Sequence, residues 1–273
     1  MFKRLRFGNA GAPLSSVSRK IPDGIQRQKE LKLDGLEIQF VRQVYLHKEQ
    51  CPEIKTLAKK EDKVLTCHAS FFVNLSSNDK EKQTQSLQRI YDAAIMADKC
   101  GAKFVTFHAG YYHDNDHEEV YQTIKNNLSQ LKDKLEHEGC KIKLSPETTG
   151  KISQFGSLHE LVRLGKEIGT HLCVDFAHLH AREGKVNSYE EFCNVLSLLK
   201  TELNCLDNMH IHMAGINYGP KGERNHLNLK DSDFKWKELM KAFKEFGVRG
   251  IIISESPNIE GDAMLMRDYY ESL

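Results

Sequence analysis

The cysteines of the sequence are poorly arranged to organise a fold. Its seven cysteines are odd in number, lie scattered, and include no CxxC pair. This pattern argues against a disulfide framework and against a zinc knuckle built from thiolates. We expect a reducing, intracellular and cytoplasmic location for such a chain.

Long apolar runs and a strong charge bias are also missing. No apolar run approaches the roughly 18 residues of a membrane span, and the opening residues MFKRLRFGNAG contain no apolar signal-peptide core. We therefore expect neither a leader nor a membrane anchor. The net charge of +1 argues against binding nucleic acid by gross charge, although it allows a local basic rim.

Linkers and nucleotide-binding loops are absent from the sequence as well. No stretch rich in Pro, Gly or Ser divides the chain, which favours a single domain over residues 1–273. No GxGxxG or Walker loop follows any predicted strand. A doubly wound open sheet therefore lacks its usual motifs and remains the structural alternative.

The sequence does contain a regular alternation of strand and helix patterns. Between the predicted strands lie segments with helical spacing, such as the apolar positions Val120, Ile124 and Leu128. Repeated βα units of this kind predict an α/β protein with a single (β/α)8 barrel, the TIM barrel. The eight predicted strands lie within residues 5–10, 35–40, 64–70, 104–110, 141–147, 171–179, 208–215 and 250–256.

Polar residues mark the expected starts of several helices. Ser157 with Glu160 has the spacing of a capping box. Ser232 or Asp233 is the expected N-cap of the helix that contains Trp236.

Imidazoles and carboxylates stand at the ends of six consecutive predicted strands. In a (β/α)8 barrel the carboxyl ends of the strands surround one pocket, so such side chains would converge. One isolated residue of this kind is more often a hydrogen-bonded core histidine or a helix-capping carboxylate, but their joint placement favours a site for zinc, manganese or iron. The residues are His68, His108, Glu147, Asp175, His178, His210, His212 and Glu255.

Alternation along the strands refines this set. His210 and His212 point to the same side, so one can bind a metal while the other supports it. Cys173 alternates with Asp175, and we interpret it as a small buried hydrophobe. His178 follows where the strand is expected to give way to a loop.

A polar segment follows the seventh predicted strand. We expect residues 218–226 to form a loop, in which Glu223 and His226 either complete a further metal site or are simply solvated.

Together these motifs resemble the endonuclease IV family of apurinic/apyrimidinic endonucleases (AP endonuclease family 2), within the xylose isomerase-like TIM barrels. The resemblance extends over nearly the whole chain. The segments that carry it are residues 68–75, 107–110, 146–150, 173–178, 209–210 and 254–257.

The resemblance implies up to three Zn²⁺ ions per chain, with Mn²⁺ or Fe²⁺ as substitutes. The family spaces the last two ligands of the third ion as aspartate, one residue, histidine, whereas here two residues separate them. The implied ligands are His68, His108 and Glu147 for the first ion, Glu147, Asp175, His210 and Glu255 for the second, and His178, Glu223 and His226 for the third.

The implied activity is hydrolysis of the phosphodiester 5′ to an abasic site in duplex DNA, a step of base excision repair. Glu147 and Glu255 would be the catalytic carboxylates. Arg42, Phe71 and Arg224 would contact DNA, with Phe71 standing where the family usually has tyrosine. We expect a monomer whose partner is duplex DNA that contains abasic sites.

Two other functions fit part of this pattern. A metal-dependent sugar isomerase or epimerase of the same superfamily would hold one metal with Glu147, Asp175, His210 and Glu255. The additional histidines have no necessary role there, which favours the endonuclease. A DNA-binding module without catalysis would not need the intact ligand sets.

The carboxyl-terminal stretch 264–270 resembles a sliding-clamp peptide only weakly, because the leading glutamine is absent. We expect this stretch to be a helix that packs on the barrel.

Overall fold

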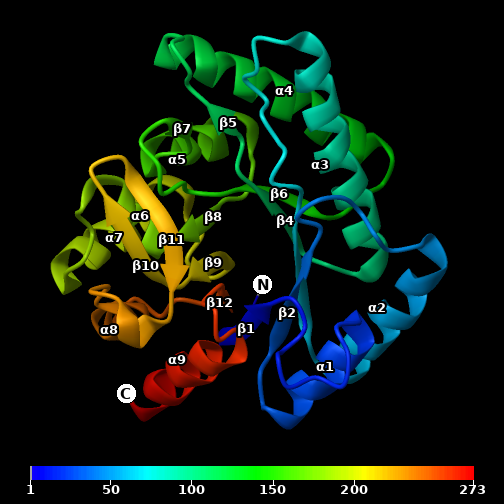
Figure 1. The fold of residues 1–273 in the computed structure, drawn as a ribbon, viewed down its shortest axis with the longest axis vertical. Coiled ribbons are helices and arrows are strands. Elements are labelled where there is room, and N and C mark those ends of the chain that lie inside the picture. Colours follow the sequence, from blue (N-terminus) through cyan, green and yellow to red (C-terminus); the bar gives the residue numbers. More distant parts are fainter. Residues whose placement is uncertain (1) are drawn as a thin grey trace. The chain divides into compact units, whose positions relative to one another are not determined.

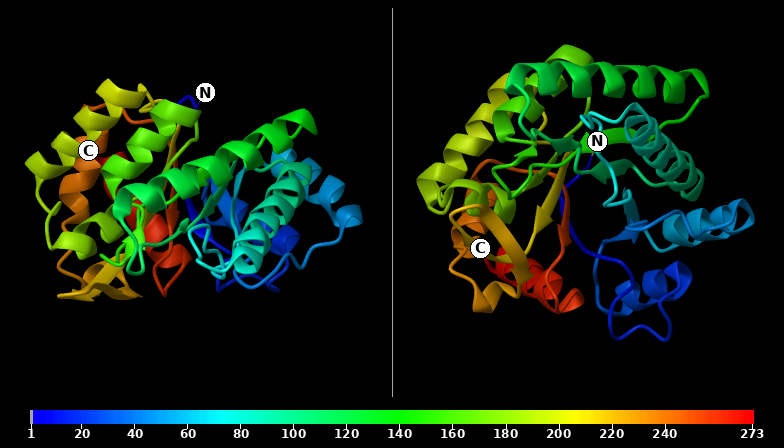
Figure 2. Two further views of the ribbon diagram at one scale, coloured as in Figure 1. Left: turned by 90° about the horizontal axis from the view of Figure 1, so that it is seen from above. Right: turned by 45° about the horizontal axis from the view of Figure 1, so that its top comes forward.

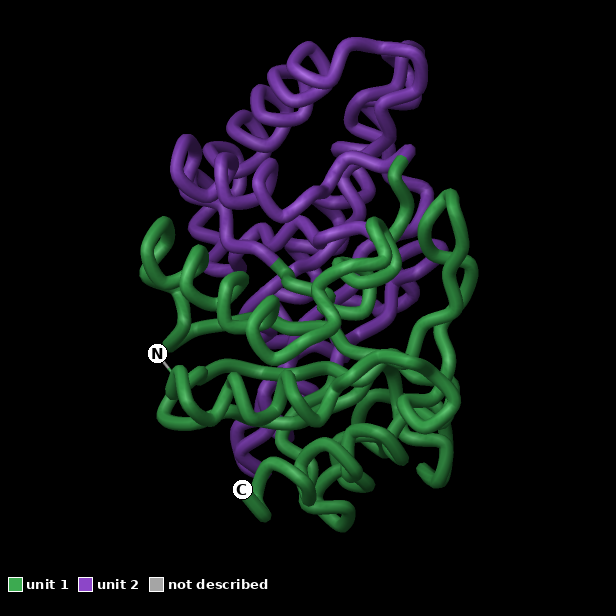
Figure 3. The backbone as a smooth tube through the Cα atoms, turned by 90° about the vertical axis from the view of Figure 1, so that its left-hand side faces the viewer, with its two compact units in different colours: residues 1–36, 150–152, 173–273 green, residues 37–149, 153–172 purple. Residues whose placement is uncertain are grey.

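The computed structural model describes residues 2–273, and the chain divides into two compact units (Figure 3). Unit 1 comprises Met1–Leu36, Gly150–Ile152 and Cys173–Leu273, and unit 2 comprises Glu37–Thr149 and Ser153–Leu172. Each unit contains parallel strands alternating with helices. The expectation of a single domain over residues 1–273 stays a prediction.

The order of the parallel strands identifies the fold class. Among the described residues, eight strands form one sheet in the order β6-β4-β3-β2-β1-β12-β9-β8. The first strand, β1 (Leu5–Ala10), pairs in parallel with the last, β12 (Gly250–Ser254). Pairing of the first strand with the last, while all other neighbours follow chain order, is the arrangement of a (β/α)8 barrel and confirms the predicted fold.

Unit 1 contains four of these strands and a separate antiparallel hairpin. The parallel strands are β1, β12, β9 (Met209–Met213) and β8 (Cys173–Asp175), and the hairpin consists of β10 (Gly215–Gly219) and β11 (Gly222–Leu227). Phe176 packs edge to face on Phe243 in its core, with ring centroids 5.4 Å apart. Its helices are α1 (Ile21–Glu30), α6 (Phe176–Glu183), α7 (Tyr189–Leu203), η2 (Leu229–Asp231), α8 (Trp236–Glu245) and α9 (Glu260–Ser272).

Unit 2 contains the remaining parallel strands. Strand β2 (Gly35–Gln39) enters it from unit 1, and β3 (Val64–His68), β4 (Phe104–Phe107) and β6 (Lys143–Pro146) follow. A short antiparallel pair, β5 (Gly110–Tyr111) and β7 (Gln154–Phe155), lies beyond β4 and β6 in the chain. Its helices are η1 (Lys48–Gln50), α2 (Cys51–Lys60), α3 (Lys80–Cys100), α4 (His117–His137) and α5 (Leu158–Ile168).

Several predicted helix features are confirmed. The apolar face that begins at Val120 and Ile124 is buried in α4. Ser157 and Glu160 form the predicted capping box of α5, with both reciprocal hydrogen bonds present. These features are local in sequence, which explains why the sequence pattern reveals them.

Three local expectations are wrong. Neither Ser232 nor Asp233 caps α8, which begins after Lys235 without a side-chain cap. Residues 218–226 are not a loop, because most of them belong to the β10–β11 hairpin. After Asp175 the chain enters α6 directly and does not form a loop.

Helix α9 lies against β1 and β12 (Figures 1 and 2). Met266 is fully buried, and Tyr270 contacts Phe7 with ring centroids 5.6 Å apart. This packing matches the expected helix over residues 264–270. Within residues 2–273, none of the helices combines the length and apolar character needed to cross a membrane.

Candidate metal centre

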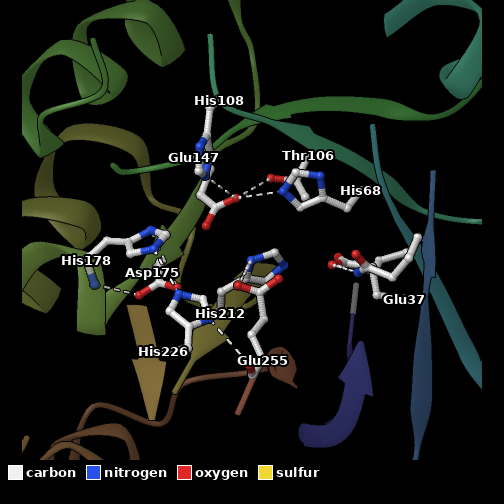
Figure 4. A network of polar contacts seen from close by, with 12 residues as sticks. Glu37, His68, Thr106, His108, Glu147, Asp175, His178, His212, His226 and Glu255 are labelled. Carbon is white, nitrogen blue, oxygen red and sulfur yellow. Dashed lines mark hydrogen bonds and ion pairs between the residues drawn. The ribbon is translucent and has the colours of Figure 1, made fainter. Parts of the chain in front are cut away.

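Unit 2 brings together the first predicted ligand set. Glu147 follows β6 directly, and its Oε2 lies 3.4 Å from Nε2 of His68, the last residue of β3. The same oxygen lies 3.4 Å from Nε2 of His108, which follows β4 (Figure 4). All three are at carboxyl ends of adjacent strands, and the side chain of Glu147 is fully buried. The arrangement can hold a metal ion.

Hydrogen bonding identifies which nitrogen of His68 faces this set. Its Nδ1 lies 2.6 Å from the backbone oxygen of Ala69. A carbonyl oxygen only accepts, so Nδ1 carries the proton and Nε2 presents its lone pair to Glu147. Backbone bonding of this kind fixes ring orientation in metal-binding histidines.

In unit 1 the junction of β8 and α6 positions two further ligands. Asp175 is the last residue of β8 and the N-cap of α6, and its Oδ1 accepts a 2.7 Å hydrogen bond from the backbone nitrogen of His178. Nδ1 of His178 lies 3.6 Å from the other carboxylate oxygen. The carboxylate therefore orients the imidazole, and Nε2 is left facing outward from α6.

The hairpin adds Glu223 and His226 to His178. Nε2 of His178 lies 3.2 Å from Nε2 of His226 and 3.5 Å from Oε2 of Glu223. Nε2 of His226 lies 3.9 Å from Oε1 of Glu223. Glu223 and His226, the two candidate ligands from the polar segment after β9, thus lie next to His178.

These facing atoms are all rich in electrons. Nδ1 of His226 lies 3.3 Å from the backbone oxygen of Glu255, so this nitrogen is the protonated one. The two Nε2 lone pairs and the Glu223 carboxylate then repel one another unless a cation or an added proton lies between them. Separations of 3.2–3.9 Å are those of ligand atoms around one ion.

A β-bulge explains the unusual spacing of Glu223 and His226. In the β10–β11 pairing, Asn217 opposes Asn225 and Tyr218 opposes Glu223, so Arg224 has no opposite residue. Residues three apart normally point to opposite faces of a strand. The extra residue restores a common face for Glu223 and His226.

Gly150 makes this approach possible. A Cβ atom at Gly150 would lie 2.7 Å from Cβ of Glu223 and 3.0 Å from Cδ2 of His178. The backbone nitrogen of Glu223 also donates a 2.9 Å hydrogen bond to the Gly150 oxygen. Glycine is therefore required for the backbone to come this close to the ligands.

The hairpin lies against α6 (Figure 1), and a second network of hydrogen bonds attaches it there. The Tyr218 hydroxyl donates a 2.9 Å hydrogen bond to Asp233, whose other oxygen lies 3.3 Å from Nε2 of the buried His180. Burial and the bond to Asp233 raise the pKa of Tyr218. Asp233 is thus occupied in holding the hairpin, which explains why it does not cap α8.

Strand register separates the two histidines of β9. His212 pairs with Asp175, the last residue of β8, and its Nδ1 lies 3.4 Å from Oε2 of Glu255. His210 pairs with Cys173, one pleat further from the carboxyl end. The carboxyl ends of the strands therefore bring together Asp175, His212 and Glu255. The ligand atoms of these three residues lie within 4.8 Å of one another.

Two buried residues of the barrel strands were not foreseen as polar partners. Glu37 on β2 is fully buried, and its carboxylate accepts hydrogen bonds from Thr66 at 2.8 Å and Gln39 at 3.0 Å. Cys173 lies with His210 and His212, not among apolar side chains alone. Alternation along β8 was the available signal for Cys173, which faces the same side as the predicted ligand Asp175. Strand β2 contains no predicted ligand that could have marked Glu37 in the same way.

The predicted DNA-contact residues of unit 2 lie in neighbouring segments. Phe71 is 58% exposed, and its ring stands edge-on to His68 at 5.2 Å. Phe72, which the sequence did not single out, is 64% exposed. Exposed Arg42 lies next to this segment, because its backbone oxygen accepts a 3.1 Å hydrogen bond from the Ser70 hydroxyl.

Arg224 lies on the hairpin of unit 1. It is exposed, and its guanidinium lies over Gly219, at which a Cβ atom would be 2.7 Å from one guanidinium nitrogen. The bulge thus directs Arg224 away from the face that carries Glu223 and His226.

Two curated relatives differ in how much of the chain they match. An uncharacterized protein of Methanocaldococcus jannaschii is 38% identical over 273 residues, which cover 98% of each chain. A probable endonuclease 4 of Thermoplasma volcanium is 29% identical over 134 residues, which cover 47% of this chain and 45% of the relative.

Solved structures show the same fold in proteins of two kinds. Endonuclease IV from Thermus thermophilus aligns with a TM-score of 0.73 and 18% identity, covering 99% of this chain and 100% of the other. A D-tagatose 3-epimerase-like protein aligns with a TM-score of 0.76 and 20% identity, covering 98% and 96%. At these identities the similarity establishes the fold alone.

The family model provides the classification. The model described as xylose isomerase-like TIM barrel matches residues 25–271, which is most of the chain. The match agrees with the strand order and with metal-ligand side chains at the carboxyl ends of the strands. The chain belongs to the xylose isomerase-like TIM barrel family.

Proposed function

We propose that the chain is a metal-dependent phosphodiesterase of the endonuclease IV type, which cuts duplex DNA 5′ to abasic sites. The observation that carries the proposal is the facing set of His178, Glu223 and His226, with separations of 3.2–3.9 Å. A one-metal sugar site does not need this set. The relatives named endonuclease 4 support the same choice.

The proposed ligands fall into three sets. The bulged hairpin meets the family requirement for a carboxylate and a histidine on one face despite the added residue. In the second set we replace His210, implied by the resemblance, with His212, because His212 lies beside Glu255. The sets are His68, His108 and Glu147; Asp175, His212 and Glu255; and His178, Glu223 and His226.

Zinc suits these nitrogen and carboxylate ligands, and bound divalent cations lower the pKa of water and stabilise charge on phosphate oxygens. Glu255, whose side chain is 13% exposed, is the accessible carboxylate of the second set. We assign it the role of accepting a hydrogen bond from the attacking water and so orienting it. Glu147 is fully buried and serves as a ligand that cannot move away.

The exposed aromatic segment suits a DNA partner that lacks a base. Phe71 and Phe72 present apolar rings to solvent beside Arg42. Aromatic side chains of this kind insert between base steps or fill a gap in the stack. An abasic nucleotide is easier to flip out because no base has to be unpaired.

A sugar epimerase remains the second candidate, favoured by the D-tagatose 3-epimerase-like neighbour. Asp175, His212 and Glu255 are ligands that such a site would also use. It would need one metal, and two of its carboxylates would move a proton beside a carbonyl.

Measurement of both metal content and DNA cleavage distinguishes the endonuclease from the sugar epimerase. We expect about three zinc or similar ions per purified chain and a single nick in a duplex with one abasic site. The matching undamaged duplex and a panel of ketohexoses serve as controls. One ion per chain, epimerisation of a ketose and no nick would establish the rival function.

Substitution of Glu147 tests the role of the carboxylate that faces His68 and His108. Glu147→Gln keeps the size of the side chain but removes a charge that faces both His68 and His108. We expect nicking to fall by at least about 10³-fold, since a metal ligand is lost. Glu138→Gln, on the surface of the same unit, is the control. Full activity of the Glu147 variant with unchanged metal content would contradict the assigned ligands.

A further inference from the structure

Unit 1 contains a sulfur-bearing donor set, of which the proposed function uses only His212. Cys173 and His210 are register partners on the adjacent strands β8 and β9, and His212 lies one pleat closer to the carboxyl end. One ligand atom of each lies within 4.8 Å of the others. All three side chains are fully buried.

We propose that Cys173, His210 and His212 form a binding site for a thiophilic metal ion, beneath the carboxylate-containing set. Tetrahedral zinc with bonds of about 2.0–2.3 Å keeps its ligand atoms about 3.5 Å apart. Shifts of about 1 Å in side chains that already lie within 4.8 Å would close such a site. The mixed thiolate and imidazole donors suit Zn²⁺ or Co²⁺ and disfavour Mg²⁺ and Ca²⁺.

The donor types distinguish this site from the three sets proposed for DNA cleavage. Those sets contain only imidazole and carboxylate groups, so sulfur marks an ion bound at Cys173 and nowhere else among them. Metal binding requires the thiolate form, so the Cys173 proton is released to solvent when the ion enters.

His212 belongs to this set and to the set of Asp175 and Glu255. The ring of His212 stands nearly perpendicular to that of His210, with an interplanar angle of 86° and centroids 5.0 Å apart. A neutral imidazole offers one lone pair, so His212 binds either an ion beside Glu255 or one beside Cys173, and it binds both only as an imidazolate whose N–H proton is released to solvent.

Cobalt substitution tests the site directly. The full-length chain, freed of metal with a chelator, would be titrated with Co²⁺ alone and followed by absorption spectroscopy. We expect a thiolate-to-cobalt charge-transfer band in the near ultraviolet.

Two cysteine variants locate the sulfur. Cys173→Ser should abolish the charge-transfer band while leaving the visible bands of the other cobalt sites. Cys67→Ser is the matched control, because Cys67 is also fully buried on a barrel strand and directly precedes the ligand-type residue His68. A band that persists in Cys173→Ser would overturn the proposal, and so would its absence from the wild-type chain at cobalt saturation.

A measurement on the unaltered chain covers the case in which Cys173→Ser does not fold. X-ray absorption of the zinc-loaded protein should contain a sulfur shell at about 2.3 Å beside nitrogen and oxygen at about 2.0 Å. A spectrum without sulfur at full zinc loading would refute the site. Neither measurement uses DNA, so both outcomes are independent of the proposed nuclease activity.

Discussion

Gly150 is the single residue on which the geometry around His178 depends most directly. Its missing Cβ leaves room for the side chain of Glu223, and its oxygen binds the Glu223 backbone. A small change at a position that is not itself a ligand should therefore alter metal binding.

We predict that Gly150→Ala loses about one of the bound ions while the others remain. The added methyl group would lie 2.7 Å from Cβ of Glu223, so the hairpin must move away from His178. Metal analysis by mass spectrometry, paired with circular dichroism, measures the loss. Gly139→Ala is the control, because a Cβ there meets nothing within 4 Å, although alanine is strained at the backbone φ of +75°. Equal metal content in the two variants would show that Gly150 is not required.

At the scale of elements, the hairpin of β10 and β11 carries two of the three residues of the third set, Glu223 and His226, and α6 carries the other, His178. The Lys151–Gly222 bridge and the hydrogen bond from Tyr218 to Asp233 both hold the end of the hairpin at which its turn lies. The bulge at Arg224 places Glu223 and His226 on the same face of the hairpin.

We predict that deletion of Arg224 preserves the third ion. Without the bulge, Glu223 and the histidine stand two residues apart, and a regular strand places such residues on one face. A second insertion beside Arg224 should instead turn one ligand away, because the pattern then slips by one residue. Metal content of the two variants makes the comparison, and loss of the ion in the deletion variant alone would contradict the role of the bulge.

Helices α4 and α5 are joined at the surface by a bidentate pair. Two nitrogens of Arg163 bind Glu118 at 2.6 and 2.9 Å. Hydrogen bonds from Arg163, and then from Gln122, lower the pKa of Glu118 to about 2.

We predict that this pair contributes stability only above acidic pH. The folded pKa of about 2 lies below the ordinary value of 4.5, so the stabilisation is complete above pH 4.5 and declines as pH falls toward 2. Glu118→Gln should unfold at lower denaturant concentration than the wild type at pH 7 and at an equal concentration near pH 2. Glu119→Gln, one residue along, is the control. If the difference in unfolding concentration between the wild type and Glu118→Gln stayed constant from pH 7 to pH 2, the ion pair would not be its cause.

At the scale of the whole molecule, buried imidazoles and carboxylates make the fold dependent on cations. Each unit contains electron-rich atoms that face one another at 3.2–3.9 Å. Ions that bind only the folded state stabilise it by mass action.

We predict that removal of metal lowers the melting temperature. An ion present at about a hundred times its Kd contributes about 2.7 kcal/mol, which corresponds to a Tm shift on the order of 5 °C for a chain of this size class. Differential scanning calorimetry before and after chelation measures the shift. Zn²⁺ should restore Tm, whereas Mg²⁺ should not, because imidazole ligands dominate two of the sets. An unchanged Tm in the metal-free chain would count against these sites.

Much of the fold follows from local patterns in the sequence. The run at 5–10 contains the apolar residues Leu5 and Phe7, the run at 250–254 is apolar and β-branched, and they form β1 and β12. Ser157 and Glu160 indicate the start of α5 for the same reason, since a capping box spans four residues. The sequence by itself therefore determined the (β/α)8 alternation and the presence of ligand-type side chains at the strand ends.

Tertiary structure decided which of these side chains act together. Alternation could not choose between His210 and His212, because both face the same side, and only the pairing of β8 with β9 aligned His212 with Asp175. The spacing of Glu223 and His226 was equally ambiguous until the hairpin register exposed the bulge. Register depends on hydrogen bonds between segments that are distant in sequence, and no local pattern contains that information.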